Sequence, residues 1–153
     1  MLNLTNVENK VRLDLSIVGY QFPDDSLDNW CMVKAVVEQS GDKFEYTDPA
    51  LDARDLLKIR DWFKCLSERK LPRFARLTFI EPCLEFEFLA CEGPTVRIAI
   101  GMSRELKPSF ELNQFGRANP SWRVVFELSE KEFIAILANM AKAIINYPVR
   151  GRR

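Results

Sequence analysis

The sequence predicts an α+β protein with a single, mainly antiparallel sheet of about six to seven strands and two amphipathic helices packed on one face. Three observations predict this class: short segments in which apolar and polar residues alternate, two segments with apolar residues at helical spacing, and connections too short for parallel crossovers. The expected order is βββ-α-ββββ-α. We expect a single domain over residues 1–153, with loosely ordered ends at 1–9 and 149–153.

The first three strands are expected to form a meander. Residues 11–20 alternate apolar and polar side chains, residues 30–39 are rich in valine, and residues 43–48 follow a Ser-Gly-Asp turn. In the second of these strands, one parity places Trp30 and Met32 on the uncovered face of the sheet. An apolar patch there would mark a partner site, whereas the reversed parity, or cover from the loop at 104–121, would remove it.

Two helices are expected, each followed by a proline that stops it. The first runs over about 51–68 and is opened by Asp48-Pro49, with Leu56, Ile59, Phe63 and Leu66 on one side. The second begins after Ser129, which forms an S-x-x-E capping box with Glu132, and it ends near Asn146. Its apolar stripe is wide enough to contact both the sheet and the first helix.

Four more strands are expected over residues 74–80, 83–91, 95–103 and 122–128, with a long loop at 104–121. If the hairpin between the second and third of these centres near Gly93, the apolar faces match. This register pairs Phe88 with Ile98, Phe86 with Ile100 and Leu84 with Met102.

Composition excludes several classes of function. The chain has no histidine, so it cannot build a Ser-His-Asp triad or a Cys-His pair. The four cysteines, none in a C-x-x-C pair, are expected to be reduced and mostly buried thiols, and no zinc site is expected. No run approaches the roughly 18 apolar residues of a membrane helix, and no secretion signal is seen, so the expected location is the cytoplasm.

Charge is balanced overall but unevenly distributed. The 22 basic and 22 acidic residues cancel, which argues against nonspecific nucleic-acid binding. Residues 1–60 carry 11 acids and 7 bases, a net charge of −4, and the remainder is correspondingly basic. Three arginines at the end of the chain, Arg150, Arg152 and Arg153, are expected to be solvated.

Two acidic features are candidate sites. In the strand CLEFEF, Glu85 and Glu87 share one face, so with Glu81 they suggest acid–base chemistry or a site for Mg²⁺ or Ca²⁺. Alternation explains them more simply as solvated surface, with Arg97 pairing diagonally with Glu87. The loop QFPDDSLDN carries Asp24, Asp25 and Asp28 before Trp30 but lacks the glycine and spacing of a calcium loop, so an acidic protein-binding edge is favoured.

Several short motifs occur in an order that resembles a bacterial family. They are VGYQFPD after the first strand, NW at the second, YTDPAL before the helix, FIEPCLEFEF after it, and YPVRG near the end. The set resembles the WapI family of immunity proteins over about residues 10–151. The motif residues Tyr20, Pro23, Pro49, Pro82 and Gly151 are interpreted as structural.

The resemblance implies a protein without enzymatic activity or cofactor that binds the C-terminal toxin domain of a contact-dependent or secreted polymorphic toxin. In the namesake system that domain is a nuclease acting on tRNA. The resemblance assigns no contact residues; the clustering of acids beside an aromatic side chain suggests Asp24, Asp25, Asp28, Trp30, Glu85 and Glu87. The alternatives are a small carboxylate- or metal-dependent enzyme that uses Glu81, Glu85 and Glu87, and a non-catalytic adaptor.

Overall fold

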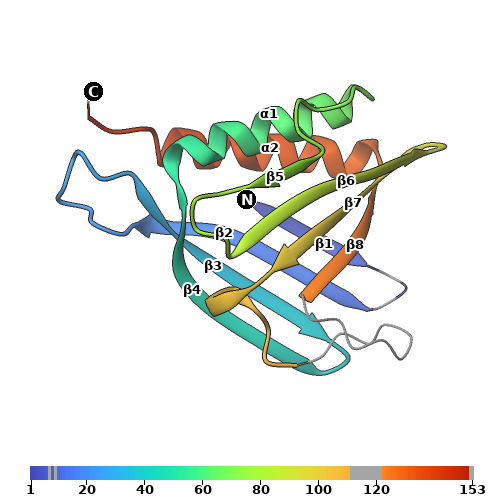
Figure 1. The fold of residues 1–153 in the computed structure, drawn as a ribbon, viewed down its shortest axis with the longest axis horizontal. Coiled ribbons are helices and arrows are strands. Elements are labelled where there is room, and N and C mark those ends of the chain that lie inside the picture. Colours follow the sequence, from blue (N-terminus) through green and yellow to red (C-terminus); the bar gives the residue numbers. More distant parts are fainter. Residues whose placement is uncertain (7, 9, 111–121, 152–153) are drawn as a thin grey trace.

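The computed structural model describes residues 1–6, 8, 10–110 and 122–151 (Figure 1). The elements in chain order are β1 (Leu2–Asn6), β2 (Val11–Tyr20), β3 (Trp30–Gln39), β4 (Asp42–Asp52), α1 (Ala53–Ser67), β5 (Arg76–Thr78), β6 (Leu84–Glu92), β7 (Thr95–Met102), the short 3-10 helix η1 (Arg104–Leu106), β8 (Trp122–Leu128) and α2 (Glu130–Asn146). The α+β class is confirmed. No helix in the described chain is both long enough and apolar enough to cross a membrane.

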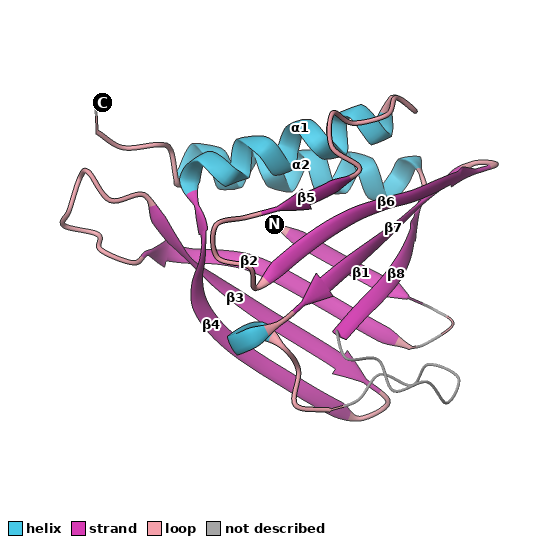
Figure 2. Ribbon diagram, in the orientation of Figure 1, coloured by secondary structure: helices cyan, strands magenta, loops and turns pink. Residues whose placement is uncertain are grey.

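The strands form two antiparallel sheets, so the prediction of one sheet of six to seven strands is wrong. The first sheet has the order β1-β2-β3-β4 and the second the order β5-β6-β7-β8 (Figure 2). Helix α1 lies between the two sets of strands in the chain, so β5 does not continue the first sheet beyond β4. Within each sheet, strands that follow one another in the chain pair with each other, and the apolar faces of the two sheets join in one hydrophobic cluster with the helices.

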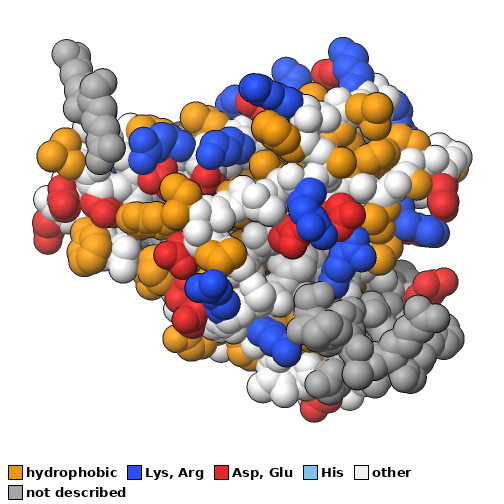
Figure 3. All heavy atoms as spheres, viewed as in Figure 1, with side chains coloured by type: hydrophobic (Ala, Val, Ile, Leu, Met, Phe, Trp, Pro, Cys, Tyr) orange, Lys and Arg blue, Asp and Glu red, His pale blue; other side chains and the backbone are white. Residues whose placement is uncertain are grey.

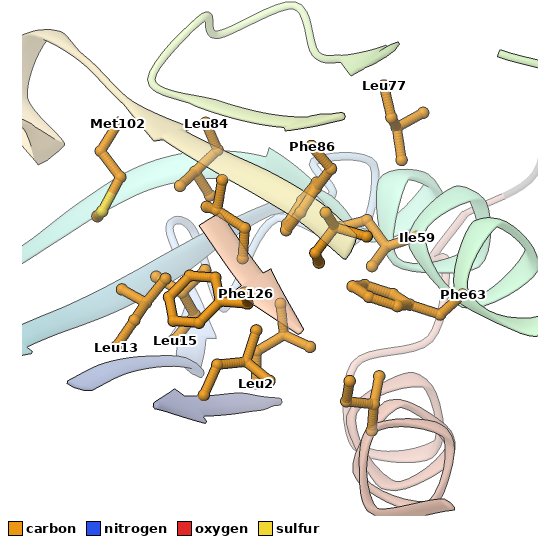
Figure 4. Packing of buried hydrophobic residues seen from close by; sticks show 14 of the residues in the cluster. Leu2, Leu13, Leu15, Ile59, Phe63, Leu77, Leu84, Phe86, Met102 and Phe126 are labelled. Atoms are coloured by element: carbon orange, nitrogen blue, oxygen red, sulfur yellow. The ribbon is translucent and has the colours of Figure 1, made fainter. Parts of the chain in front are cut away.

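The helices do not cover one face of a sheet as predicted. Helix α1 packs along α2, α2 also contacts β1 and β8, and α1 contacts β4. Figure 1 shows the pair lying across one end of the two sheets. Residues from both sheets and both helices therefore meet in the same core, as the converging side chains of Figure 4 show.

The first strand begins at Leu2, so the expected loose end at 1–9 is wrong for this segment. Leu2 pairs with Leu15 and Leu4 with Leu13 on β2, and both N-terminal leucines are buried. Only two apolar residues alternate over LNLTN, which is too short a pattern to predict a strand. The segment becomes a strand because it pairs with β2, where Leu2 and Leu4 lie opposite the buried Leu15 and Leu13.

Helix α1 covers most of the predicted span of about 51–68, but Asp48-Pro49 does not open it. Strand β4 continues through Pro49 to Asp52, which is possible because β4 is an edge strand and the register with β3 shifts between Cys31 and Val33. Asp52 is the N-cap: its carboxylate accepts a hydrogen bond from the backbone of Arg54 at 2.8 Å. The capping box predicted at α2 is confirmed, with the Ser129 backbone N–H donating to the Glu132 carboxylate at 2.8 Å.

The hairpin of β6 and β7 has the predicted register. Phe88 lies opposite Ile98, Phe86 opposite Ile100 and Leu84 opposite Met102. The parity of β3 is also resolved in favour of the first alternative, with Cys31, Val33, Ala35 and Val37 buried and Trp30, Met32, Lys34 and Val36 partly exposed. Of the predicted loop at 104–121, residues 104–106 form η1 and residues 111–121 lie outside the described residues.

Candidate functional site: a clasped acidic loop

The loop between β2 and β3, residues 21–29, is shaped by its own aspartates. The Asp25 carboxylate accepts a hydrogen bond from the Leu27 backbone N–H at 2.9 Å, and the Asp28 carboxylate accepts one from the Trp30 backbone at 2.9 Å. The Gln21 backbone N–H donates to the Trp30 carbonyl at 2.7 Å and closes the base of the loop. Asp25 and Asp28 therefore have a structural role as Asx turns in addition to their charge.

The C-terminal segment is hydrogen-bonded to the backbone of this loop. The Arg150 guanidinium donates to the carbonyl of Phe22 at 3.0 Å and of Pro23 at 2.8 Å, and it also donates to the carbonyl of Asp28. Its carbon Cζ lies 3.7 Å from the centre of the Tyr20 ring. A single arginine thus joins three carbonyls of the loop and an aromatic ring, which fixes the loop backbone.

Further contacts join the loop region to the C-terminal segment. We call the whole arrangement the clasp; its residues are Tyr20, Asn29, Tyr147, Arg150 and Gly151. Asn29 is buried, and its side chain accepts from the Arg150 N–H at 2.6 Å and donates to the Arg150 carbonyl at 3.1 Å. The Tyr20 hydroxyl donates to the Pro148 carbonyl at 2.6 Å, and its ring meets the Tyr147 ring edge-on at 5.4 Å.

Gly151 closes the clasp because only glycine fits there. Its φ is +75°, and a Cβ at this position would lie 2.9 Å from the Ser26 carbonyl oxygen. The motifs VGYQFPD and YPVRG, far apart in sequence, therefore meet in one structural unit. The expectation that 149–151 forms a loose end, and that Arg150 is solvated, is wrong.

The clasped loop presents apolar and acidic side chains together. Phe22 and Leu27 are 51% and 62% exposed, and Asp24 and Asp25 are exposed beside them. Figure 3 shows acidic and hydrophobic side chains adjoining at the left end of the molecule, where this loop lies in Figure 1. Trp30, suggested from the sequence as the aromatic anchor, is only partly exposed, so Phe22 and Leu27 are the exposed apolar groups.

Sequence reasoning missed Phe22, Leu27 and Arg150. Both apolar residues stand singly among turn-forming residues, where no periodicity indicates which way a side chain points. Arg150 lies 128 residues from Phe22 along the chain. The one indication in the sequence was that VGYQFPD and YPVRG both belong to the motifs that resemble one family. Motifs of one family can lie side by side in the fold even when they are far apart in the chain.

Glu85 and Glu87 share one face of β6, as predicted, but they are paired with arginines. Arg76 forms ion pairs with both glutamates, and Arg123 forms one with Glu87. Arg97, the predicted partner of Glu87, instead pairs with Glu92 and Glu127, at 3.1 and 3.0 Å. Two arginines offset two glutamates here, so this face does not extend the acidic surface of the loop.

Glu81 lies apart from the other two glutamates and near a different cluster. The Cys83 thiol donates weakly to the carboxylates of Asp48 at 3.9 Å and Glu105 at 3.7 Å, and Glu81 acts on both Asp48 and Cys83 electrostatically. Burial, with these carboxylates, raises the pKa of the Cys83 thiol to about 11, so it is protonated at neutral pH. The three glutamates suggested as an enzyme site therefore do not converge.

The Asp48 carboxyl has a raised pKa, first because of burial and then because of Glu105 and Glu81. Its deprotonation therefore costs more in the folded state, and stability is lost as pH rises from the ordinary pKa of 3.8 through the raised one. We expect Asp48→Asn to raise the melting temperature at pH 7 and to leave it nearly unchanged at pH 3. Thermal unfolding at both pH values tests this, and equal effects at both would contradict it.

All four cysteines are free, as expected, but they are less uniformly buried than predicted. Cys31 and Cys83 are buried, Cys65 is intermediate and Cys91 is exposed. Burial raises the pKa of the Cys31 thiol to about 12, so it too stays protonated at neutral pH.

The clasp makes a direct prediction for Arg150→Ala. We expect the loop at 22–28 to lose most of its protection from amide hydrogen exchange, because three carbonyl contacts and the stacking on Tyr20 are lost. The free energy of unfolding should fall by about 1–3 kcal/mol. Arg152→Ala, which removes the same charge from the tail, is the control; equal exchange in the two variants would show that Arg150 does not hold the loop.

The fold and this loop define a small α+β protein with an acidic, partly apolar loop that its C-terminal segment holds in place. The family comparison agrees with the motif resemblance. The chain belongs to the immunity protein WapI-like family, whose model matches residues 3–148. No curated protein and no solved structure matches the chain.

Proposed function

We propose that this protein is a cytoplasmic immunity protein that binds and neutralises the C-terminal domain of a polymorphic bacterial toxin, and that the clasped loop at 21–29 makes the contact. Membership of the WapI-like immunity protein family carries the functional part of the proposal. The loop carries the structural part, since it combines exposed apolar groups, three aspartates and a backbone held by Arg150.

The physical character of the loop suits a tight inhibitor. Interface energy concentrates in a few apolar anchors surrounded by polar residues, and Phe22 and Leu27 are such groups with Asp24 and Asp25 beside them. A backbone already held by Arg150 loses little conformational entropy on binding. Fixed acids also speed association with a basic partner.

The acidic character favours a nuclease as the toxin. A nuclease active site binds phosphate and is therefore positively charged, so carboxylates presented on a protruding loop complement it. Asp28 and Trp30 stand at the margin of this surface. Glu85 and Glu87, already paired with Arg76 and Arg123, have a secondary place in the proposal.

Co-expression tests the function directly. The toxin domain encoded beside this gene should kill cells when expressed alone and should be harmless when this protein is present. Equal killing with and without the protein would contradict the proposal. Titration calorimetry with Mg²⁺, Mn²⁺ and Ca²⁺ tests the metal-dependent enzyme alternative, which requires measurable binding of at least one of these ions.

The paired glutamates give a graded prediction within the same assay. Glu85→Gln with Glu87→Gln should change toxin affinity by less than about threefold, because rim charges already offset by arginines contribute little. Glutamine is preferred to lysine, since lysine would place four cations together with Arg76 and Arg123. A loss of tenfold or more in surface plasmon resonance would move the contact surface to this sheet.

A further inference from the structure

The outward face of helix α2 carries a line of exposed apolar residues. Ile134, Ala138, Ala141 and Ile145 are all exposed, and the two isoleucines are 64% and 76% exposed. Their spacing of four, three and four residues places them in one line along the helix, opposite the buried Phe133 and Met140. We call this line the α2 stripe. The sequence predicted that the wide apolar surface of this helix contacts both the sheet and the first helix. The α2 stripe is the portion of that apolar surface that neither the sheets nor α1 cover.

Helix α1 provides an internal comparison. It lies beside α2 (Figure 2). Its solvent-facing line is Arg54, Lys58, Asp61 and Lys64, all charged and exposed. The solvent-facing side of α1 therefore has the usual charged surface of a helix exposed to water. The four residues of the α2 stripe are uncharged, and the exposed Lys131 and Lys142 border it on one side. An exposed apolar line with a charged border is typical of a helix that packs against another surface.

The stripe is symmetric about its midpoint, which lies between Asn139 and Met140. Reversing the helix direction about this point superimposes Ile134 on Ile145 and Ala138 on Ala141. We propose that the α2 stripe pairs antiparallel with the same stripe of a second copy of this chain. A two-fold dimer requires one patch that is complementary to itself, and the sequence Ile-x₃-Ala-x₂-Ala-x₃-Ile meets this requirement in the antiparallel direction.

The side chains suit close helix packing. The two alanines at the centre let the helix axes approach to the short end of the usual 8–10 Å range. In this register the alanines of the two copies face each other at the centre, and Ile134 of one copy meets Ile145 of the other at each end. One helix face buries less than the roughly 800 Å² per partner of a standard stable interface, so we expect a dimer that forms with rising concentration.

Sedimentation equilibrium on the full chain tests the proposal. Between about 10 µM and about 1 mM, the range for an interface of this size, the weight-average mass should rise from 17.8 kDa towards twice that value. Ile134→Glu and Ile145→Lys should each keep the mass at that of one chain. An equimolar mixture of these two variants should dimerise again, because the antiparallel pair then has Glu opposite Lys at one end and Ile opposite Ile at the other.

The controls separate this surface from general effects of charge. Lys64→Glu, on the exposed face of α1, should dimerise like the parent. The stripe variants should melt within a few degrees of the parent, since their side chains are exposed. A parent that stays monomeric at all concentrations overturns the proposal, and a variant mixture that stays monomeric overturns the antiparallel pairing. The measurement does not involve a toxin, so its outcome is independent of the proposed function.

Discussion

Replacing Phe86 by alanine should lower the free energy of unfolding by about 3–5 kcal/mol, the usual cost of removing a buried aromatic ring. Phe86 is fully buried on β6 and contacts the rings of Phe63 and Phe79 at 5.9 Å and that of Trp62 at 6.0 Å. These rings belong to α1 and to the segment after β5. Its loss therefore opens a cavity where a sheet, the helix layer and a connecting segment meet (Figure 4).

Urea unfolding at neutral pH gives the measurement. A domain stability of about 5–15 kcal/mol means that this change alone removes a large part of the total. Phe86→Leu, which keeps most of the volume, should cost distinctly less. A loss below about 1 kcal/mol for the alanine variant would mean that the aromatic cluster does not join the two layers as the structure places it.

The alternation in CLEFEF accounts for much of what the sequence could predict. It places Leu84, Phe86 and Phe88 inward and the two glutamates outward without information from the rest of the chain, because strand parity depends only on neighbours. The register of the β6–β7 hairpin and the capping box at Ser129 are local in the same way. These features are confirmed because short-range geometry decides them.

The division into two sheets could not be predicted on the same basis. Strand patterns show which face is buried but not which surface buries it, and two stacked sheets satisfy the same alternation as one larger sheet. Strand β1 was missed for a related reason, since its two leucines become a strand only beside β2. Partners distant in sequence decide both features.

The candidate site likewise has features that the local sequence predicts and features that only distant residues determine. The acids of the 21–29 loop were recognised from composition alone. Their fixed arrangement depends on Arg150 and Asn29, which are joined by a reciprocal pair of hydrogen bonds at 2.6 and 3.1 Å across 121 residues of chain. The charge balance at Glu85 and Glu87 likewise depends on Arg76 from the adjacent strand β5 and on Arg123 from β8, two strands away in the sheet. Local sequence identifies ionisable groups, but tertiary partners determine which of them form ion pairs.

Removing the apolar groups of the clasped loop should abolish protection against the toxin. We expect Phe22→Ala with Leu27→Ala to weaken toxin binding at least 100-fold, because two anchors at about 2 kcal/mol each are the energy of typical hot spots. Both side chains are exposed, so the melting temperature should stay within a few degrees of the parent. Surface plasmon resonance against the cognate toxin domain, with survival in co-expression, measures the effect.

The loop's charge should act mainly on the association rate. The triple change of Asp24, Asp25 and Asp28 to asparagine keeps the side-chain oxygens that accept from Leu27 and Trp30, so the loop shape is preserved. We expect association about tenfold slower at low salt and nearly equal to the parent at high salt, where exposed charges are screened. If the parent protects cells and both loop variants protect equally well while folded, the immunity function stands but the contact surface lies elsewhere. If the parent gives no protection, the function itself is wrong.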